Sequence, residues 1–224
     1  MAQDTTVRWA DGWVTADMDV TLELPGIELL RRSSGPSLRA HIARERSVLM
    51  QVAAGRPLSD VLQELLRSVE DASRLRMMAS VLEVSEDGGC LRHLAAPSLP
   101  AAYSDAIDGA PVGEGVGSCG TAAHRGTPVY VTDIASDPLW TDYRDLALAH
   151  GLRACWSTPI RGMDDIIRGT FAVYYDEPRS PHPHDLEAIA GITLTVALAI
   201  ERHRTDMQLR SMRAELSALI KATS

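Results

Sequence analysis

The sequence predicts an α+β fold in which helices cover one face of an antiparallel sheet. Three observations predict it. Two stretches with apolar residues at helical spacing come first, within residues 37–69. Short apolar or alternating runs separated by turn-forming residues follow, within residues 77–175. Residues 184–220 then contain no proline and only one glycine, which predicts a long C-terminal helix.

Residues 1–36 form an N-terminal extension that differs from the rest of the chain. Six acidic residues lie there among tryptophans and alternating apolar residues, which predicts one or two strands that end at Pro25-Gly26. We expect this extension to pack on the body of the protein rather than to fold independently. A Ser-Ser-Gly-Pro sequence at residues 33–36 predicts a break before the first helix.

Two helices are predicted next. The first covers residues 37–54 of an N-terminal helical segment, 37–57, and Gly55 ends it. Its apolar face consists of Leu38, Ile42, Leu49 and Val52. The second helix begins after Pro57, and its apolar residues at helical spacing predict a stripe buried in the core. This stripe consists of Leu58, Val61, Leu62, Leu65, Leu66 and Val69.

Five strands are predicted in the central domain, residues 58–202. They cover residues 77–85, 90–95, 128–132, 153–160 and 168–175. A glycine-rich segment at 112–120 and a short helix ending at Gly126 lie between the second and third strands. A long connection at 133–151, with a short helix over 143–150, separates the third strand from the fourth. Asp164-Asp165 predicts a hairpin turn between the last two strands.

The end of the long helix, residues 203–224, has the pattern of a coiled coil. Its apolar residues Leu209, Met212, Leu216 and Leu219 repeat at 3-4-3 spacing, which is the seam of a coiled coil. Two turns of seam are too short to hold two chains together alone. We therefore expect this segment to extend a homodimer that the domain helices begin.

Charge and composition exclude some classes of partner. The chain of 224 residues has 22 Lys+Arg against 30 Asp+Glu, a net charge of −8. An acidic surface argues against nucleic-acid binding, which depends on clustered positive charge. The apolar run at 188–200 is interrupted by polar residues and is shorter than a bilayer requires, so we expect no membrane partner. The polar N-terminus has no secretory signal, so we expect a cytoplasmic location with free thiols at Cys90, Cys119 and Cys155.

Several sequence blocks, in order, resemble a GAF domain of the kind found in bacterial sensor kinases and signalling regulators. The resemblance covers residues 58–202, about two thirds of the chain. The blocks are Gly115-Val116-Gly117-Ser118-Cys119-Gly120-Thr121-Ala122-Ala123, Gly126-Thr127-Pro128-Val129, Asp133-Ile134, Asp137-Pro138-Leu139-Trp140, Gly151-Leu152-Arg153-Ala154-Cys155-Trp156-Ser157-Thr158-Pro159-Ile160 and Gly169-Thr170-Phe171-Ala172. The resemblance implies a PAS-related antiparallel sheet of about six strands, a small-molecule pocket over one face, and a dimer made by the terminal helices.

Nine residues are candidates for the wall of the implied pocket. They are Ser118, Cys119, Gly120, Trp140, Tyr143, Leu146, His150, Cys155 and Ser157. Backbone amides at the helix start after the glycine-rich loop suit a small anion or a carbonyl oxygen. Alternatively, this segment is a tight turn in which Ser118 caps its own helix. The connection at 133–151 is expected to cover the pocket with an apolar wall, although Trp140 and Leu146 equally suit a core.

The cysteines allow two interpretations. Cys119 lies near a helix start, where the helix dipole favours a thiolate. Strand alternation places Cys155 and Ser157 on the face that the resemblance assigns to the pocket. Two thiols in one cavity suit a redox switch or a soft metal site, whereas the alternative is two small buried apolar residues. We expect no metal site, since His182 and His184 do not have metal-binding spacing.

Each specialised branch of the resembled family has its own residue pattern, and this sequence can be compared with each. The central domain has no lysine for the Asn-Lys pattern of cyclic-nucleotide binders, and no adjacent Cys-His pair as in bilin binders. His150 is expected to be a helix-end residue rather than a haem ligand. Free methionine sulfoxide reductases share Cys119-Gly120-Thr121-Ala122, but Cys155 and Ala172 replace their pocket acids. The cofactor thus stays unidentified, a small organic molecule or anion rather than haem, bilin or a cyclic nucleotide.

The sequence as a whole predicts a non-catalytic sensor of a small molecule or small anion. Ligand state would reach a separate signalling protein through dimeric terminal helices, and this requires different ligand affinities for two helix arrangements. The alternative is a thiol-based redox sensor or a methionine sulfoxide reductase-like enzyme that uses Cys119 and Cys155. A scaffold with an empty pocket is a third hypothesis.

Overall fold

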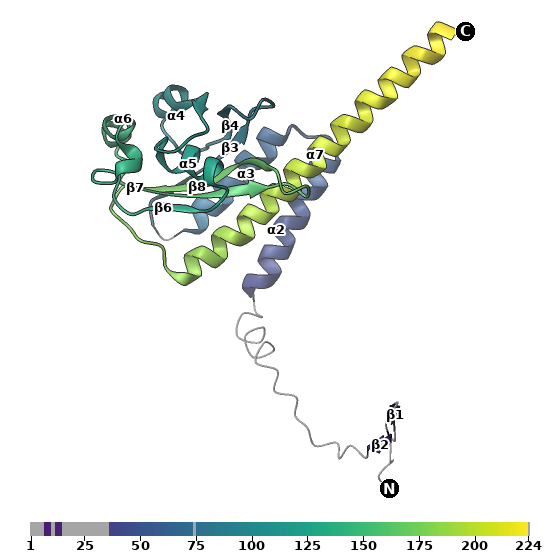
Figure 1. Ribbon diagram of the computed structural model, residues 1–224, viewed down its shortest axis with the longest axis horizontal. Coiled ribbons are helices and arrows are strands. Elements are labelled where there is room, and N and C mark those ends of the chain that lie inside the picture. The colour runs from purple at the N-terminus through teal and green to yellow at the C-terminus, as the bar shows by residue number, and fades with distance from the viewer. Residues whose placement is uncertain (1–6, 10–11, 15–35, 74, 224) are drawn as a thin grey trace. The chain divides into compact units, whose positions relative to one another are not determined.

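The computed structural model describes residues 7–9, 12–14, 36–73 and 75–223 (Figure 1). The chain divides into two compact units, Met1–His41 and Ile42–Ser224. In the first unit, strand β1 (Val7–Trp9) pairs antiparallel with β2 (Gly12–Val14). The strands predicted to end at Pro25-Gly26 lie outside the described residues.

The second unit is built on a sheet of six antiparallel strands in the order β5-β4-β3-β8-β7-β6. The strands are β3 (Met77–Val84), β4 (Cys90–Ala95), β5 (Ala110–Pro111), β6 (Val129–Val131), β7 (Ala154–Arg161) and β8 (Ile167–Tyr175). The five strands predicted from the residues are confirmed to within about two residues. The short β5 completes the six strands that the resemblance implied.

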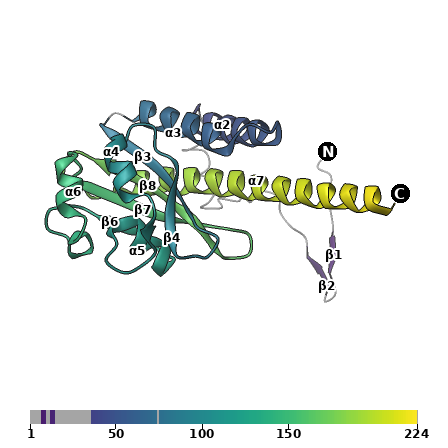
Figure 2. The ribbon, with the colours of Figure 1, turned by 90° about the horizontal axis from the view of Figure 1, so that it is seen from above.

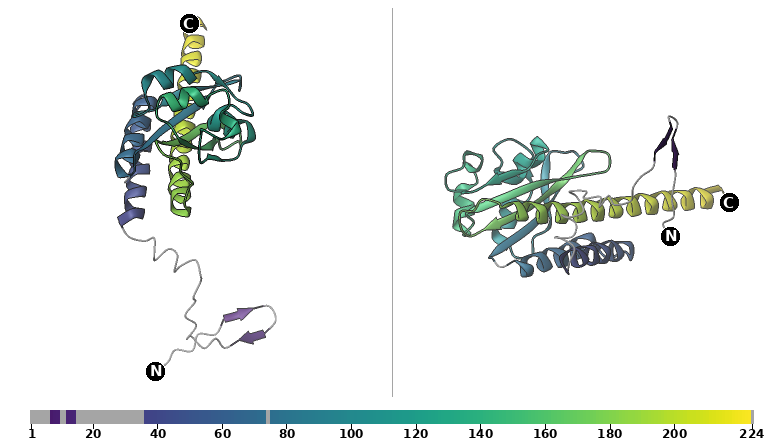
Figure 3. Two further views of the ribbon diagram at one scale, coloured as in Figure 1. Left: turned by 90° about the vertical axis from the view of Figure 1, so that its left-hand side faces the viewer. Right: turned by 90° about the horizontal axis from the view of Figure 1, so that it is seen from below.

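Helices lie on both faces of this sheet (Figures 2 and 3). Three long helices cover one face: α2 (Pro36–Ala53, of which residues 42–53 belong to this unit), α3 (Leu58–Ala72) and α7 (Pro183–Thr223). The opposite face carries short elements: α4 (Ala101–Ile107), α5 (Gly117–Arg125), the 3-10 turn η1 (Pro138–Trp140) and α6 (Arg144–Ala149). The predicted α+β fold, with a six-stranded antiparallel sheet and a long C-terminal helix, is confirmed. The long helices share one face, as predicted, whereas the short helices occupy the opposite face, which the predicted fold class left without helices.

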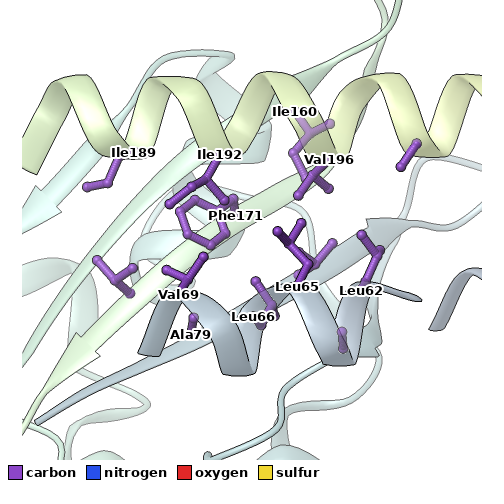
Figure 4. Close-up of a cluster of buried hydrophobic side chains, with 14 of the residues drawn as sticks. Leu62, Leu65, Leu66, Val69, Ala79, Ile160, Phe171, Ile189, Ile192 and Val196 are labelled. Carbon is purple, nitrogen blue, oxygen red and sulfur yellow. The ribbon is translucent and has the colours of Figure 1, made fainter. Parts of the chain in front are cut away.

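Strand alternation divides the buried side chains into two clusters. On β8, Phe171, Val173 and Tyr175 join the cluster under the long helices. Ala172 and Tyr174, between them in sequence, join the cluster under the short elements. Figure 4 shows the first cluster, where α3 and α7 direct their apolar residues toward Phe171. The central strands β3, β8 and β7 therefore contact the long helices on one face and the short elements on the other.

The predicted apolar face of α3 agrees with the observed burial, whereas that of α2 differs at one residue. All six predicted stripe residues of α3 are buried. On α2, Val48 and Val52, one turn apart, are buried, whereas Ile42 is 54% exposed. The predicted apolar face of α2 is therefore wrong at Ile42, because the helix meets the core only through its last two turns.

Helix α7 differs along its length. Ile192, Val196 and Ile200 are buried in the first cluster. Its second half is exposed and extends beyond the sheet, since 41 residues of helix span about 60 Å (Figure 1). Among the described residues, α7 is the one helix long and apolar enough to cross a bilayer by length and composition. Its share in the core accounts for that apolar composition.

Leu66 provides a test of the core under the long helices. Replacing this fully buried side chain by alanine should lower the free energy of unfolding by about 2–5 kcal/mol, because a cavity remains where methyl groups packed. Chemical denaturation measures the change. The control Met163→Ala removes a side chain that is 86% exposed and should change stability by less than about 0.5 kcal/mol. Equal losses in both variants would contradict this core.

Candidate functional site

The glycine-rich loop brings the start of α5 close to its own backbone. Gly115 and Gly117 have φ of 77° and 54°, in the left-handed region where glycine is favoured. At Gly120 an added Cβ would lie 2.6 Å from the Val116 Cβ and 2.8 Å from the Pro111 carbonyl oxygen. Helix α5 therefore begins at Gly117 against the loop, with little free space at its N-terminus.

Ser118 joins three elements through one hydroxyl. Its Oγ donates a hydrogen bond to the Cys155 carbonyl oxygen on β7, at 3.0 Å. The same Oγ accepts a hydrogen bond from the Trp140 indole Nε1, at 3.1 Å. The alternative in which Ser118 caps its own helix is wrong, because Val116 is the N-cap and no side chain caps the helix. The hydroxyl instead connects α5, β7 and the 133–151 connection.

A cavity of about 30 Å³ lies between the sheet and the short elements. It is lined by Leu82, Leu91, Tyr103, Ile107, Ala110, Val116, Gly117, Ser118, Cys119, Gly120, Trp140, Tyr143 and Tyr174. One water molecule needs roughly 10–15 Å³ of such space, so the cavity holds about two. Residues 133–151 cover the cavity and are called the cover. The rings of Tyr103 and Tyr174, with centroids 6.1 Å apart, fill much of the space beneath it.

Thiol and hydroxyl groups gather at the sheet side of this cavity. The Cys119 Sγ lies 3.7 Å from the Tyr174 hydroxyl oxygen. Hydrogen bonding from the Cys155 thiol is the main cause that lowers the pKa of Cys119 to about 7, against the opposing effect of burial. The hydroxyls of Ser157, Tyr174 and Thr170 lower it further. Burial raises the pKa of Cys155 well above its ordinary value, so this second thiol keeps its proton.

The structure places the nine candidate residues in three groups. Five line the cavity: Ser118, Cys119, Gly120, Trp140 and Tyr143. Two lie on β7 beside the Cys119 sulfur, Cys155 and Ser157, as strand alternation predicted. The last two lie outside the lining: Leu146 packs against the second cluster, and the His150 ring meets the Tyr103 ring edge-to-face at 5.8 Å.

Two aromatic residues of the site were not predicted. Tyr174 follows from the same alternation that identified Cys155, because the two are directly paired across β7 and β8. Tyr103 lies on α4, a short helix in a proline- and alanine-rich stretch that carries no periodic signal. Burial raises the pKa of both tyrosines well above the usual value, so both hydroxyls stay neutral.

The lining of the cavity has no ionised carboxylate or basic side chain. Within the described part of the chain, no group of three or more His, Cys, Asp or Glu side chains is arranged to hold a metal ion. The rings of His182 and His184 stack on each other at 5.9 Å, away from the cavity. The site is therefore apolar, with neutral hydroxyls and two thiols as its polar groups.

A larger cavity of about 230 Å³ lies on the other face of the sheet. It is lined by Arg44, Val69, Ala72, Ser73, Leu75, Met77, Phe171, Val173, Tyr175, Asp185, Ala188, Ile189 and Ile192. Figure 4 shows that Val69, Ile189 and Ile192 approach Phe171 from the two long helices. The first turns of α7 are therefore loosely packed against α3 and the sheet.

Comparisons with known proteins agree with this architecture. Residues 55–201 match the family model described as GAF domain. A "Methyl sulfide methyltransferase-associated sensor" from Methanosarcina acetivorans is 34% identical over 160 residues. That match covers 71% of this chain but only 16% of the relative.

Solved structures resemble the fold of the second unit. A domain of a putative two-component sensor histidine kinase from Sinorhizobium meliloti has a TM-score of 0.56 and 22% identity, over 67% of this chain and 96% of that chain. A type II free methionine-R-sulfoxide reductase from Thermoplasma acidophilum has a TM-score of 0.51 and 16% identity, over 64% and 93%. At these identities the likeness shows the fold alone.

Ser118 provides a test of how the cover of the cavity is held. Ser118→Ala should lower the free energy of unfolding by about 1–3 kcal/mol, because the buried Trp140 indole loses its acceptor. Amide hydrogen exchange over residues 138–149 should also become faster. The control Ser136→Ala removes an exposed hydroxyl of the same connection, 3.4 Å from the Asp133 carbonyl oxygen, and should change neither. Unchanged exchange in Ser118→Ala would contradict this role.

Proposed function

This chain belongs to the GAF domain family, and we propose that it is a signalling sensor that holds a small neutral molecule between the sheet and residues 133–151. The observation that carries the proposal is that β7 and β8 contact the cavity region on one face and α7 on the other. Their residues line or support the cavity on one face and pack against α7 on the other. A change at the cavity can thus reach the long helix through two strands.

The lining supports the chemical class of the ligand. An anion buried beside the Cys119 thiol needs a compensating cation, and the cavity lining offers none. Apolar walls with a few hydroxyls suit a small uncharged molecule. With about 30 Å³ available, any ligand larger than two or three heavy atoms must displace Trp140 or Tyr143. Ligand binding is therefore tied to movement of the cover.

Polar contacts carry such a movement from the strands to α7. The Trp156 indole Nε1, on the helix face of β7, donates to the Arg179 carbonyl oxygen at 2.9 Å, just before α7. The Arg179 guanidinium reaches Asp185, in the first turn of α7, at 3.6 Å. Further along, Arg168 on β8 forms an ion pair of 3.2 Å with Glu201. Both ends of the packed half of α7 are thereby attached to the sheet.

We propose that the terminal helices transmit the signal by forming a homodimer. The surfaces that form this dimer are the output surface. A groove between α2 and α7 is lined by Ile42, Glu45, Arg46, Leu49, Met50, Ala53 and Arg202. It adjoins the second half of α7, where Leu209, Met212 and Leu216 are 48–59% exposed at coiled-coil spacing. A second copy of the chain supplies the same apolar seam, so it covers both surfaces at once. A separate signalling protein would then read the arrangement of the helices.

A reductase function has less support. The pocket-facing residues of β7 and β8 under α5 are Cys155, Ser157, Ala172 and Tyr174. None of them is a carboxylate, so these strands offer no anionic partner to a substrate ammonium and no carboxylic acid to protonate the substrate. The sensor therefore remains the function that the site supports best.

Native mass spectrometry of the purified chain tests the ligand. We expect a co-purified small molecule that dissociates on activation, and its addition at 100 times its dissociation constant should stabilise the fold by about 2.7 kcal/mol. Ala110→Leu, which fills the cavity, should remove the adduct. The control Ala101→Leu, on the exposed side of α4, should keep it. An adduct that survives Ala110→Leu would place the ligand elsewhere.

Size-exclusion chromatography with light scattering tests the dimer. The chain, of 24.3 kDa, should elute at twice that mass at micromolar concentration. Met212→Lys combined with Leu216→Lys should weaken the dimer and shift the measured mass toward that of the monomer, because four like charges would face each other across the seam. The control Ser217→Lys adds charge outside the seam and should stay dimeric. A wild-type monomer would overturn the proposed output surface.

A further inference from the structure

The function proposed above makes no use of the two buried thiols beside the cavity. We propose that Cys119 and Cys155 form a reversible intramolecular disulfide when the chain meets a hydroperoxide, which makes the pair an oxidant-sensitive modification site. This inference requires neither the small-molecule ligand nor the dimer.

The geometry brings the two thiols next to the same residue of the sheet, Tyr174. The Ser118 hydroxyl fastens the start of α5 to β7 at the Cys155 carbonyl oxygen, at 3.0 Å. Cys119 is the next residue, and its Sγ lies 3.7 Å from the Tyr174 hydroxyl oxygen. Tyr174 is the direct cross-strand partner of Cys155. Both thiols therefore adjoin the Tyr174 side chain from neighbouring elements.

The surroundings of Cys119 suit a thiolate. Ser157 and Thr170 have fully buried hydroxyls that find no hydrogen-bond partner among the described residues. Both face the Cys119 sulfur and lower its pKa, and the Cys155 thiol has the largest such effect. The lowered pKa raises the thiolate fraction of Cys119 at neutral pH above the few per cent of an ordinary thiol with a pKa near 8.5. The titratable groups facing it are Cys155 on β7, Tyr174 on β8 and Tyr103 on α4.

An oxidant can reach Cys119 more easily than Cys155. Cys119 lines the cavity and is 8% exposed, whereas Cys155 is fully buried. The cavity of about 30 Å³ admits a molecule the size of hydrogen peroxide. An oxidant therefore meets Cys119 first, and Cys155 reacts only with the oxidised Cys119.

The reaction balances in two steps. The Cys119 thiolate attacks the terminal oxygen of the hydroperoxide, the O–O bond breaks, and the departing oxyanion takes up a proton to leave as an alcohol or as water. The Cys155 sulfur then attacks the Cys119 sulfenic acid, the S–S bond forms, and the hydroxyl leaves with the Cys155 proton as water. Two thiols and one hydroperoxide thus give one disulfide, one alcohol or water molecule, and one further water molecule. A dithiol reductant restores both thiols.

The experiment treats the full-length chain carrying Cys90→Ser with one equivalent of hydrogen peroxide. Cys90 on β4 is the third free thiol, and its removal leaves the pair alone. We expect intact mass to fall by about 2 Da, with a tryptic cross-link between the Cys119 and Cys155 peptides. Dithiothreitol should reverse both changes.

Single variants separate the two roles. With Cys155→Ser the reaction should stop at a sulfenic acid on Cys119, about 16 Da heavier and trapped by dimedone. With Cys119→Ser the peroxide should leave Cys155 unmodified, because its thiol is buried and protonated. Mass gain in multiples of 16 Da without a cross-link in the Cys90→Ser chain would overturn the proposal. That result would hold whether or not a ligand adduct or a dimer had been found, and it needs no variant of the pair to fold.

Discussion

The Ser118 hydroxyl is the contact on which the candidate site depends. It is fully buried, and it accepts from the Trp140 indole while it donates to the β7 backbone at Cys155. This interior offers few other polar groups that could replace the hydroxyl as a partner. Without it, the buried indole N–H would stay unpaired, at a cost of about 1–3 kcal/mol. The 133–151 connection, the start of α5 and the strand that carries Cys155 are linked through this one side chain.

The second constraint is the alternation of β7 and β8. On β8, Tyr174 faces the cavity while Val173 and Tyr175 face α7. On β7, Cys155 lies on the cavity side while Trp156 faces the long helices. Because alternate residues of one strand point to opposite faces, a shift of the β7 or β8 backbone moves side chains at the cavity and at the long helix together. The looser packing at the 230 Å³ cavity beside the first turns of α7 gives that helix room to respond.

Periodicity predicted those parts of the molecule whose burial follows from one repeating pattern. The α3 stripe, the sheet strands and the placement of Cys155 with Ser157 all belong to this class. Periodicity could not predict the two partners of Ser118, because they lie 22 and 37 residues away in sequence. Tyr103 was missed for a similar reason: a seven-residue helix carries no period, and its burial depends on the fold around it. Ile42 has the right spacing for a core face but lies where α2 has no sheet to cover.

The energies of these contacts are of the size that a sensor needs. A ligand shifts an equilibrium only by the difference between its affinities for the two states, and a shift from 1:99 to 99:1 requires about 5.5 kcal/mol. The Trp140–Ser118 hydrogen bond, at about 1–3 kcal/mol, is part of the free-energy gap that the ligand's affinity difference must overcome. The strand contacts with α7, namely the bond from Trp156 to the Arg179 carbonyl and the ion pair of Arg168 with Glu201, belong to the same gap. Signalling through this fold therefore depends on several small contacts that change together, because no single one of them is strong enough.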